Sequence, residues 1–408
     1  MIKKFLLVAT VIFISGCATY QSTITPARDH LVGGRCPEAL KFLEVESAKQ
    51  NGDQLVYLLD YGTALQICGD FKKSSQVFIN ADQLSEQMDY HSASRVAGAT
   101  LLNEEMIQYK GDTFEKLFIN AVAALNYLEL GETDEALVEV RRINEKFRKL
   151  QSDDKKKFEL NPFSQYLSGL IYELDHRYDD ACISYKSAYQ LDPTYRGIAL
   201  DMLRGCWLAR RTQEFDLMVK EIGPTADELK KIKTKNKNEV LIVFMQGWGP
   251  RKAPRSDNHL APYLVPVTSI TRRLKAEVAG VDSIISEPVY DVEQAAIKTL
   301  NDDYASLVTR RIGSRVAKEV IADQVRQKDQ LLGNIAWLVM VASERADLRQ
   351  WSTLPQTIQL IRIPLLAGTH KIKLTGLDSA NNTSEALPEL EVKTGPGQKK
   401  LYVVRSLK

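Results

Sequence analysis

The segment 162–195 carries a pattern of small residues, aromatic residues and proline that fits two antiparallel helices in close contact. Gly169 and Ala181 are small enough for two helices to cross closely, while Tyr185 fills the space beside them. Pro193 would end the second helix, because proline cannot continue the backbone hydrogen-bond ladder. The positions of the pattern are Gly169, Tyr172, Ala181, Tyr185, Ala188 and Pro193.

More degenerate copies of this pattern occur elsewhere in the first half of the chain. The matching positions are Gly34, Ala39 and Leu43, then Gly62, Gly69, Phe71, Phe78 and Ala81, and then Tyr127, Gly131 and Ala136. A divergent helix pair is expected between Ser92 and Asp112, and a closing unit over residues 205–222. A period of about 34 residues with these positions resembles the tetratricopeptide (TPR) repeat. A generic helical bundle is the alternative.

The resemblance to TPR proteins covers residues 23–222 and implies a binding role without chemistry. TPR proteins hold peptides or partner domains in a concave groove, which is lined mainly by the first helix of each repeat. The residues expected to line this groove and to bind a partner are Asn120, Asn126, Gln165 and Tyr166. Asn120 stands where the repeat normally has a large apolar residue, so either a groove contact or a slipped register would explain it.

Four cysteines are spaced as if they clip neighbouring repeats together. Cys36 and Cys68 are equidistant from a turn at Gly52, and Cys182 and Cys206 are equidistant from Thr194. Residues equidistant from the turn of an antiparallel helix pair lie level with each other. In an exported protein this spacing predicts the disulfides Cys36–Cys68 and Cys182–Cys206. Four buried free thiols are the alternative.

The N-terminal residues 1–16 read as an export signal, with a short basic region, an apolar run and small residues before Cys17. The apolar run is too short to span a bilayer. The sequence Ile14-Ser15-Gly16-Cys17 resembles the bacterial lipobox, which implies a mature chain that begins at Cys17 and is anchored by lipid on that residue. Ala18 implies the outer membrane, with the chain facing the periplasm. An ordinary secretory signal is the alternative.

The C-terminal part reads as a separate α+β domain over residues 239–408, after a lysine-rich linker at 223–238. Residues 239–245 form an apolar, β-branched run typical of a strand that is buried on both faces. Further strands are expected at 263–267, 283–289, 357–364, 371–375, 389–393 and 400–405. Helices are expected at 292–322 and at 331–342, the second one buried because it is nearly free of charge.

The segment 246–255 is expected to be a loop that presents a contact surface. Trp248 beside Arg251 has the composition of a binding hot spot. A tryptophan tucked into the core is the alternative.

The sequence shows no constellation of catalytic or metal-binding residues. Its five histidines lack metal-ligand spacing, and no nucleophile elbow, phosphate loop or dinucleotide fingerprint occurs. Without Lys3 and Lys4, 54 basic residues become 52, which equals the 52 acidic ones, so bulk attraction to nucleic acid is not expected.

The expected function is a lipid-anchored scaffold in envelope assembly, secretion or cell-wall regulation. It would bind an envelope protein and need no cofactor. A periplasmic enzyme acting on glycan or peptide is the alternative.

Overall fold

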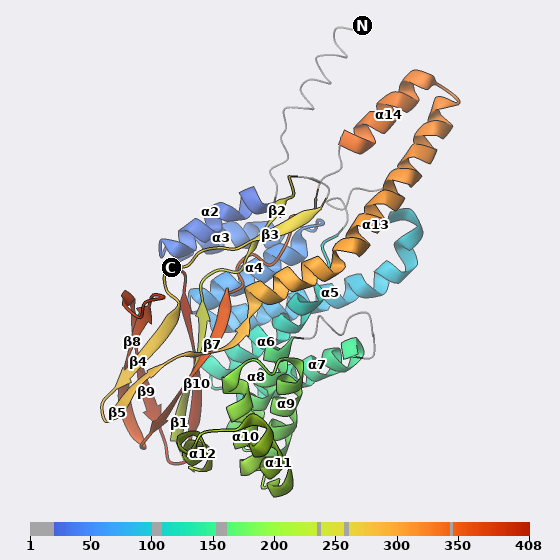
Figure 1. Cartoon of the computed structure of the whole chain (residues 1–408). Helices are drawn as coiled ribbons and strands as arrows, with labels where there is room; N and C mark the ends of the chain where they lie inside the picture. Colours follow the sequence, from blue (N-terminus) through green and yellow to red (C-terminus); the bar gives the residue numbers. More distant parts are fainter. Residues whose placement is uncertain (1–19, 100–107, 152–160, 235–237, 257–260, 343–345) are drawn as a thin grey trace.

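The computed structural model describes residues 20–99, 108–151, 161–234, 238–256, 261–342 and 346–408. Its first half is a series of helical hairpins that stack along the chain (Figure 1). The hairpins are α2 (Tyr20–Val32) with α3 (Cys36–Ser47), α4 (Gln54–Ile67) with α5 (Phe71–Ala99), α6 (Thr113–Glu129) with α7 (Thr133–Gln151), α8 (Pro162–Leu174) with α9 (Tyr178–Leu191), and α10 (Arg196–Leu208) with α11 (Thr212–Ile222). This arrangement is the TPR-like solenoid that the sequence pattern predicted.

Glycines mark the places where these helices touch. A Cβ atom on Gly169 of α8 would lie 2.5 Å from the ring of Tyr185, and one on Gly205 of α10 would lie 2.8 Å from the same ring. Tyr185 of α9 is completely buried between the two glycines. Gly62 of α4 meets Phe78 of α5 in the same way, at 2.8 Å. The glycines of the pattern are therefore small because an aromatic ring of the neighbouring helix occupies the space that a side chain would need.

Both predicted disulfides are present. Cys36 of α3 bonds to Cys68, the residue that follows α4, and Cys182 of α9 bonds to Cys206 of α10. Each bridge joins the second helix of one hairpin to the first helix of the next.

Two details of the helical part differ from expectation. The helix α5 is continuous over 29 residues, so Ser92 lies inside it and does not begin a new hairpin. The rest of that expected pair falls partly on residues 100–107, outside the described residues. The expected linker contains a helix, α12 (Ala226–Lys233), which begins with a capping box between Thr225 and Glu228 and buries Ile232. The lysine-rich run therefore belongs to a folded helix and not to an extended linker.

The C-terminal domain contains two four-stranded sheets. The first has the order β10 (Lys399–Ser406), β1 (Asn238–Gln246), β7 (Thr357–Leu365), β6 (Glu287–Asp291). In it β1 runs parallel to β10 and antiparallel to β7. The second has the order β5 (Val281–Ile285), β4 (Arg273–Val278), β8 (Gly368–Leu377), β9 (Thr383–Thr394). A small hairpin pairs β2 (Arg251–Pro254) with β3 (Pro262–Val265), so part of the expected loop is a strand. The strand β4 was not expected either.

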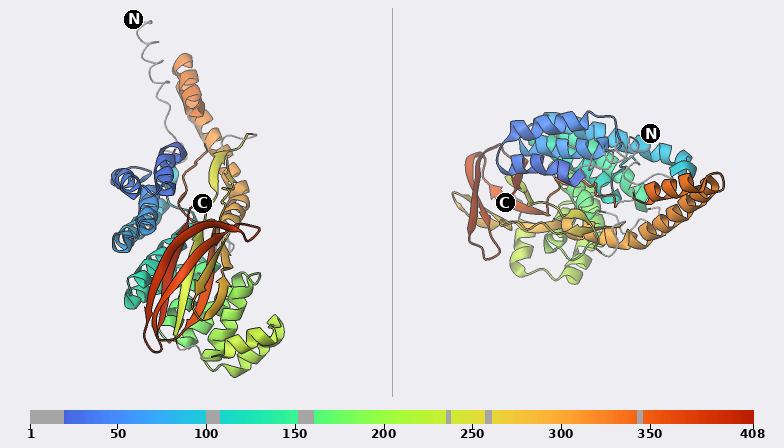
Figure 2. Two further views of the ribbon diagram at one scale, coloured as in Figure 1. Left: turned by 90° about the vertical axis from the view of Figure 1, so that its left-hand side faces the viewer. Right: turned by 90° about the horizontal axis from the view of Figure 1, so that it is seen from above.

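The first sheet is buried on both faces, as the apolar run at 239–245 predicted. Alternate residues of β1 point to opposite sides of the sheet. Val240, Ile242 and Phe244 pack against the second sheet, whereas Leu241 and Val243 join the core of the helical repeats. The order of layers is therefore solenoid, first sheet, second sheet, and the views in Figure 2 show the sheets lying along the helices.

A long helical hairpin projects beyond the rest of the fold (Figure 1). It consists of α13 (Val292–Arg326) and α14 (Gln330–Ala342). The expectation that α14 is buried is wrong for the side chains described at its start, because Leu331 is 70% exposed and Leu332 is 56% exposed. In the described part of the chain, no helix combines the length and apolarity that crossing a bilayer needs.

Candidate functional site

The helical groove is occupied by the chain's own C-terminal domain. Residues 346–356, which we call the strap, lead from the α13–α14 hairpin to β7 and lie against α4 and α6. The Thr353 backbone N–H donates to Asp60 Oδ1 over 3.1 Å, and its hydroxyl donates to the same oxygen over 2.9 Å. The Trp351 backbone N–H donates to Glu115 Oε1 over 2.8 Å. Two helix carboxylates thus hold the strap by its backbone.

Trp351 is the apolar anchor of the strap. Its side chain is 2% exposed, and its indole N–H donates to the Thr63 hydroxyl over 2.8 Å. Its ring centroid lies 5.5 Å from that of Phe78. A tilted aromatic pair at this distance adds about 0.5–1.5 kcal/mol beyond the burial of area. The strap therefore occupies the groove as a bound peptide would, with one aromatic residue inserted between helices.

A buried cluster of charges joins the first sheet to α8 and α10. Arg362 of β7 forms ion pairs with Glu173 at 3.1 Å and with Asp201 at 2.9 Å. Lys399 of β10 lies 2.6 Å from Glu173, and Arg204 lies 3.3 Å from it. A second carboxylate, that of Glu239 on β1, lies 3.0 Å from both Arg204 and Arg362. Three cations thus face three carboxylates across the junction.

Glu173 of the charge cluster differs in pKa from the two carboxylates that hold the strap. Burial raises the pKa of Asp60 to about 6, and burial together with Asp112 raises the pKa of Glu115 to about 7. Burial alone would also raise the pKa of Glu173, but Arg362, Lys399 and Arg204 hold it well below its usual value. The strap is therefore held by carboxylates that take up protons near neutral pH, and the sheet by a carboxylate that stays charged.

The residues that were expected to line a free groove are buried instead. Asn126 is completely buried and donates to the Ser74 hydroxyl over 2.7 Å. Asn120 donates to Glu139 over 2.8 Å, so this polar residue on an apolar face is explained by a polar network between helices. Gln165 donates to Asn144 over 3.1 Å, and Tyr166 donates to Asp201. The side chains of all four are therefore buried and hydrogen-bonded within the chain.

The surface expected around Trp248 is corrected as well. Trp248 is 5% exposed, and its indole N–H donates to the Leu407 carbonyl over 3.1 Å, so it is a core residue. Arg251 is half-buried at the start of β2.

Sequence analysis missed the helix carboxylates that hold the strap and the first sheet. Asp60 and Glu173 are the only charged residues of α4 and α8, and Glu115 lies in the first turn of α6. A charged residue in such a helix predicts a buried partner, because an unpaired buried charge is costly. That signal was present, but its partners, Thr353, Trp351 and Arg362, are remote in sequence and only the fold identifies them.

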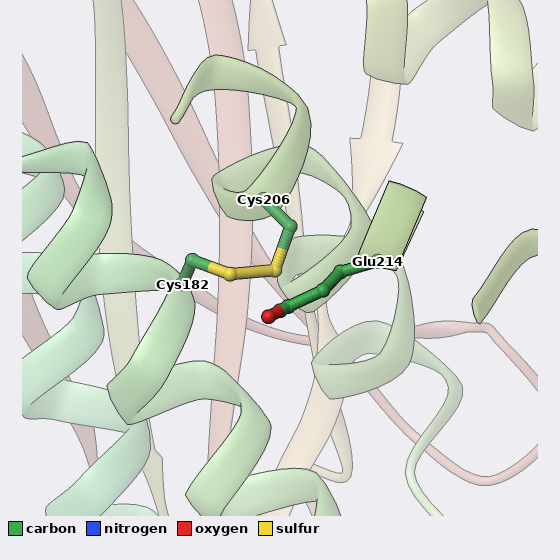
Figure 3. Close-up of side chains that lie close together, drawn as sticks. All are labelled: Cys182, Cys206 and Glu214. Carbon is green, nitrogen blue, oxygen red and sulfur yellow. A yellow bond between two sulfur atoms is a disulfide. The ribbon is translucent and has the colours of Figure 1, made fainter. Parts of the chain in front are cut away.

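In the described part of the chain, one group of side chains has ligand atoms close enough together to hold a metal ion, but these atoms are not suitable ligands. Figure 3 shows Cys182, Cys206 and Glu214 close together. The two sulfur atoms are bonded to each other, so neither is available as a thiolate ligand.

An open cleft of about 540 Å³ lies between α5 and the turn that joins α6 to α7. It is lined by Glu132, Asp134 and Glu135 among others. Asp134 and Glu135 stand in the first turn of α7, where negative charge stabilises the helix. Their position is explained by the helix, and it gives no support for acid–base catalysis.

Comparisons with known proteins find likeness only in structure. No protein-family model matches the chain, and no curated protein is similar enough to match. MamA from Desulfovibrio magneticus RS-1 has 15% identity and a TM-score of 0.32, with 52% of this chain and 92% of that chain covered. A putative kinesin light chain from Podospora anserina with nearly identical TPR-like repeats has 12% identity and a TM-score of 0.34, with 53% and 97% covered. At TM-scores this low, we draw nothing from these matches about function.

Proposed function

We propose that this protein is a lipid-anchored scaffold on the periplasmic side of the outer membrane, and that it binds a partner protein. The lipobox-like sequence before Cys17 supports the anchor, and the absence of a recognisable catalytic motif in the sequence favours binding over chemistry. The roles that such a scaffold would serve are envelope assembly, secretion or regulation of cell-wall synthesis.

We further propose that the partner docks on the start of α14 and not in the helical groove. The groove is filled by the strap and the first sheet, so a partner would have to displace them. By contrast, Leu331, Leu332 and Ile335 are 70%, 56% and 49% exposed on a hairpin that projects from the fold. Three exposed large apolar residues within five positions are typical of an interaction surface.

The composition of the hairpin favours a protein over a lipid surface. The helix α14 has no charged residue, so it lacks the basic polar face of helices that lie on membranes. The helix α13 carries acidic residues as well as basic ones along its length. Mixed charge around an apolar patch matches the polar rim of a protein interface.

The test is crosslinking in intact envelopes, followed by purification of the chain and identification of its partner. We expect Leu331→Asp and Leu332→Asp to reduce partner recovery at least tenfold, because each places a charge in the proposed interface. Leu217→Asp is the matched control, since Leu217 is 67% exposed on α11 at the far end of the molecule. Equal recovery from all three variants, with unchanged thermal melting, would exclude the hairpin as the docking site.

A further inference from the structure

Two arginines flank one buried tryptophan at the junction of α2 with the first sheet. The Arg28 guanidinium carbon lies 4.6 Å from the Trp248 ring centroid, and that of Arg405 lies 5.4 Å from the same centroid. Arg28 is 2% exposed. A third arginine, Arg251, is close enough to repel Arg28. Two cations, from α2 and β10, therefore lie against Trp248, and a third, from β2, lies near Arg28.

The donors of these three side chains are largely unused. The Nε and Nη2 atoms of Arg28, the Nε of Arg251, and the Nε and Nη1 of Arg405 are shielded from solvent and have no hydrogen-bond acceptor. By contrast, Nη2 of Arg405 donates to the Gly247 carbonyl over 2.8 Å and to the Thr353 carbonyl over 3.0 Å. A buried donor on a charged group is costly when it has no hydrogen-bond acceptor, and five nitrogens of this cluster lack one.

The charges of the cluster are not neutralised either. In the described part of the chain no ion pair joins Arg28, Arg251 or Arg405 to a carboxylate, although Asp60 and Asp29 attract Arg28 from a greater distance. Burial, followed by repulsion from Arg251, lowers the pKa of Arg28 to about 10. Burial, followed by repulsion from Arg28, lowers the pKa of Arg405 to about 9. Arg28 and Arg405 are therefore still cationic at neutral pH, and they repel each other.

We propose that Arg28, Arg251 and Arg405 form a binding site for a small oxyanion, phosphate or sulfate, beside Trp248. The fork of a guanidinium group matches the oxygens of such an ion, and hydrogen bonds between unlike charges are the strong ones. One bound dianion would accept hydrogen bonds from the unused nitrogens and offset most of the repulsion. Water would satisfy the donors but would leave the charges unbalanced.

The burial of the cluster favours a free ion over the phosphate of a lipid headgroup. Arg28 is almost completely covered, and a headgroup would have to bring its glycerol and acyl chains to the same place. A small ion needs only a brief local opening. Its binding would also stabilise the strap, because Arg405 donates to the carbonyl of Thr353.

Titration calorimetry on the full chain with inorganic phosphate, at constant ionic strength in chloride, tests the proposal. We expect saturable binding with one ion per chain, and a melting temperature that rises with phosphate but not with added chloride. Arg28→Gln should raise the Kd for phosphate at least tenfold. Arg177→Gln is the matched control, because the Arg177 guanidinium also stacks on an aromatic ring, that of Tyr172 at 4.7 Å. Arg177 is exposed on the surface and outside the cluster, so this variant should leave the Kd for phosphate unchanged.

Two outcomes would overturn the proposal. One is the absence of phosphate binding together with a higher melting temperature for Arg28→Gln, which would mean that the cluster is merely repulsive. The other is Arg28-dependent sedimentation with phosphatidylglycerol vesicles, but not with phosphatidylcholine vesicles, when free phosphate does not bind.

If Arg28→Gln fails to fold, crystals of the unaltered chain grown with selenate decide the question. The anomalous signal of selenium should appear within hydrogen-bond distance of Arg28 and Arg405, and its absence there would refute the site.

Discussion

Buried carboxylates of the helical repeats fall into two kinds at the scale of single residues. Glu173 is surrounded by cations, and its pKa is well below the usual value even though burial opposes this. Among the residues that the structure describes, no cation pairs with Glu129 of α6. It accepts a hydrogen bond from the Val403 backbone N–H, and burial raises its pKa to about 7. The first kind stabilises the fold when charged, and the second kind when protonated.

Glu129 should therefore make the protein less stable as the pH rises. Its carboxyl is protonated in the folded state up to about pH 7, whereas in the unfolded chain it loses its proton near pH 4.5. Between these values the folded state binds more protons, so the free energy of unfolding falls as pH increases. We expect Glu129→Gln, which keeps an acceptor for Val403, to be more stable than the parent at pH 8 by on the order of 1–2 kcal/mol. At pH 4.5 the two should be equal.

Urea unfolding at both pH values measures this difference. The control is Glu132→Gln, because Glu132 is exposed just beyond the end of the same helix. A stability gap for Glu129→Gln that is the same at both pH values would contradict the assigned pKa.

Arg362 is the residue whose removal should most disturb the junction between sheet and helices. It pairs with Glu173, Asp201 and Glu239, so Arg362→Met leaves an excess of buried negative charge. Removing one partner from a buried ion-pair network costs about 3–5 kcal/mol. We expect a loss of that size in the free energy of unfolding, measured with urea at pH 7. A loss below about 1 kcal/mol would show that the cluster is solvated in solution.

The strap matters at the scale of structural elements, because it fills the part of the groove formed by α4, α5 and α6. Trp351 is its large aromatic anchor between the helices, and its polar contacts include the hydrogen bonds to Asp60 and Glu115 and the ion pair of Arg349 with Asp53 at 3.0 Å. Elements held by few apolar contacts open locally before the whole fold does.

Trp351→Ala should release the strap. Truncating a buried tryptophan costs about 3–5 kcal/mol, whereas a typical remaining hydrogen bond contributes about 0.5–1.5 kcal/mol. We expect hydrogen exchange at residues 346–356 to become at least tenfold faster, while exchange in α8 and α9 is unchanged. Trp207→Ala is the comparison, because Trp207 lies on α10 away from the strap. Uniformly faster exchange in both variants would mean that the strap is not a separate unit.

We propose that the whole molecule is attached to the membrane through Cys17, which lies outside the described residues. Cys17→Ser removes the proposed site of acylation, so the chain should lose its anchor. We expect a palmitate analogue fed to the cells to label the parent chain and not the variant. The variant should also appear in the soluble periplasmic fraction. Label retained in Cys17→Ser would refute lipid attachment at this residue.

Several features of the fold follow from the sequence alone, for local reasons. The small residues Gly169 and Ala181 predict a close helix crossing, because no larger side chain fits there. The turn-centred spacing of the cysteines predicts both disulfides, because antiparallel helices place such residues level. The unbroken apolar run at 239–245 predicts a strand covered on both faces, which lies between the solenoid and the second sheet.

Only the tertiary structure decided what occupies the groove and what is left exposed. Asn126 and Tyr166 have the composition of a binding surface, but their partners are other parts of the chain. The start of α14 has the composition of a buried helix, yet Leu331 is 70% exposed within the part of the chain that the structure describes. Periodicity in a sequence shows which side of a helix will be covered. It does not show whether the cover comes from the same chain or from a partner, because that depends on contacts between residues hundreds of positions apart.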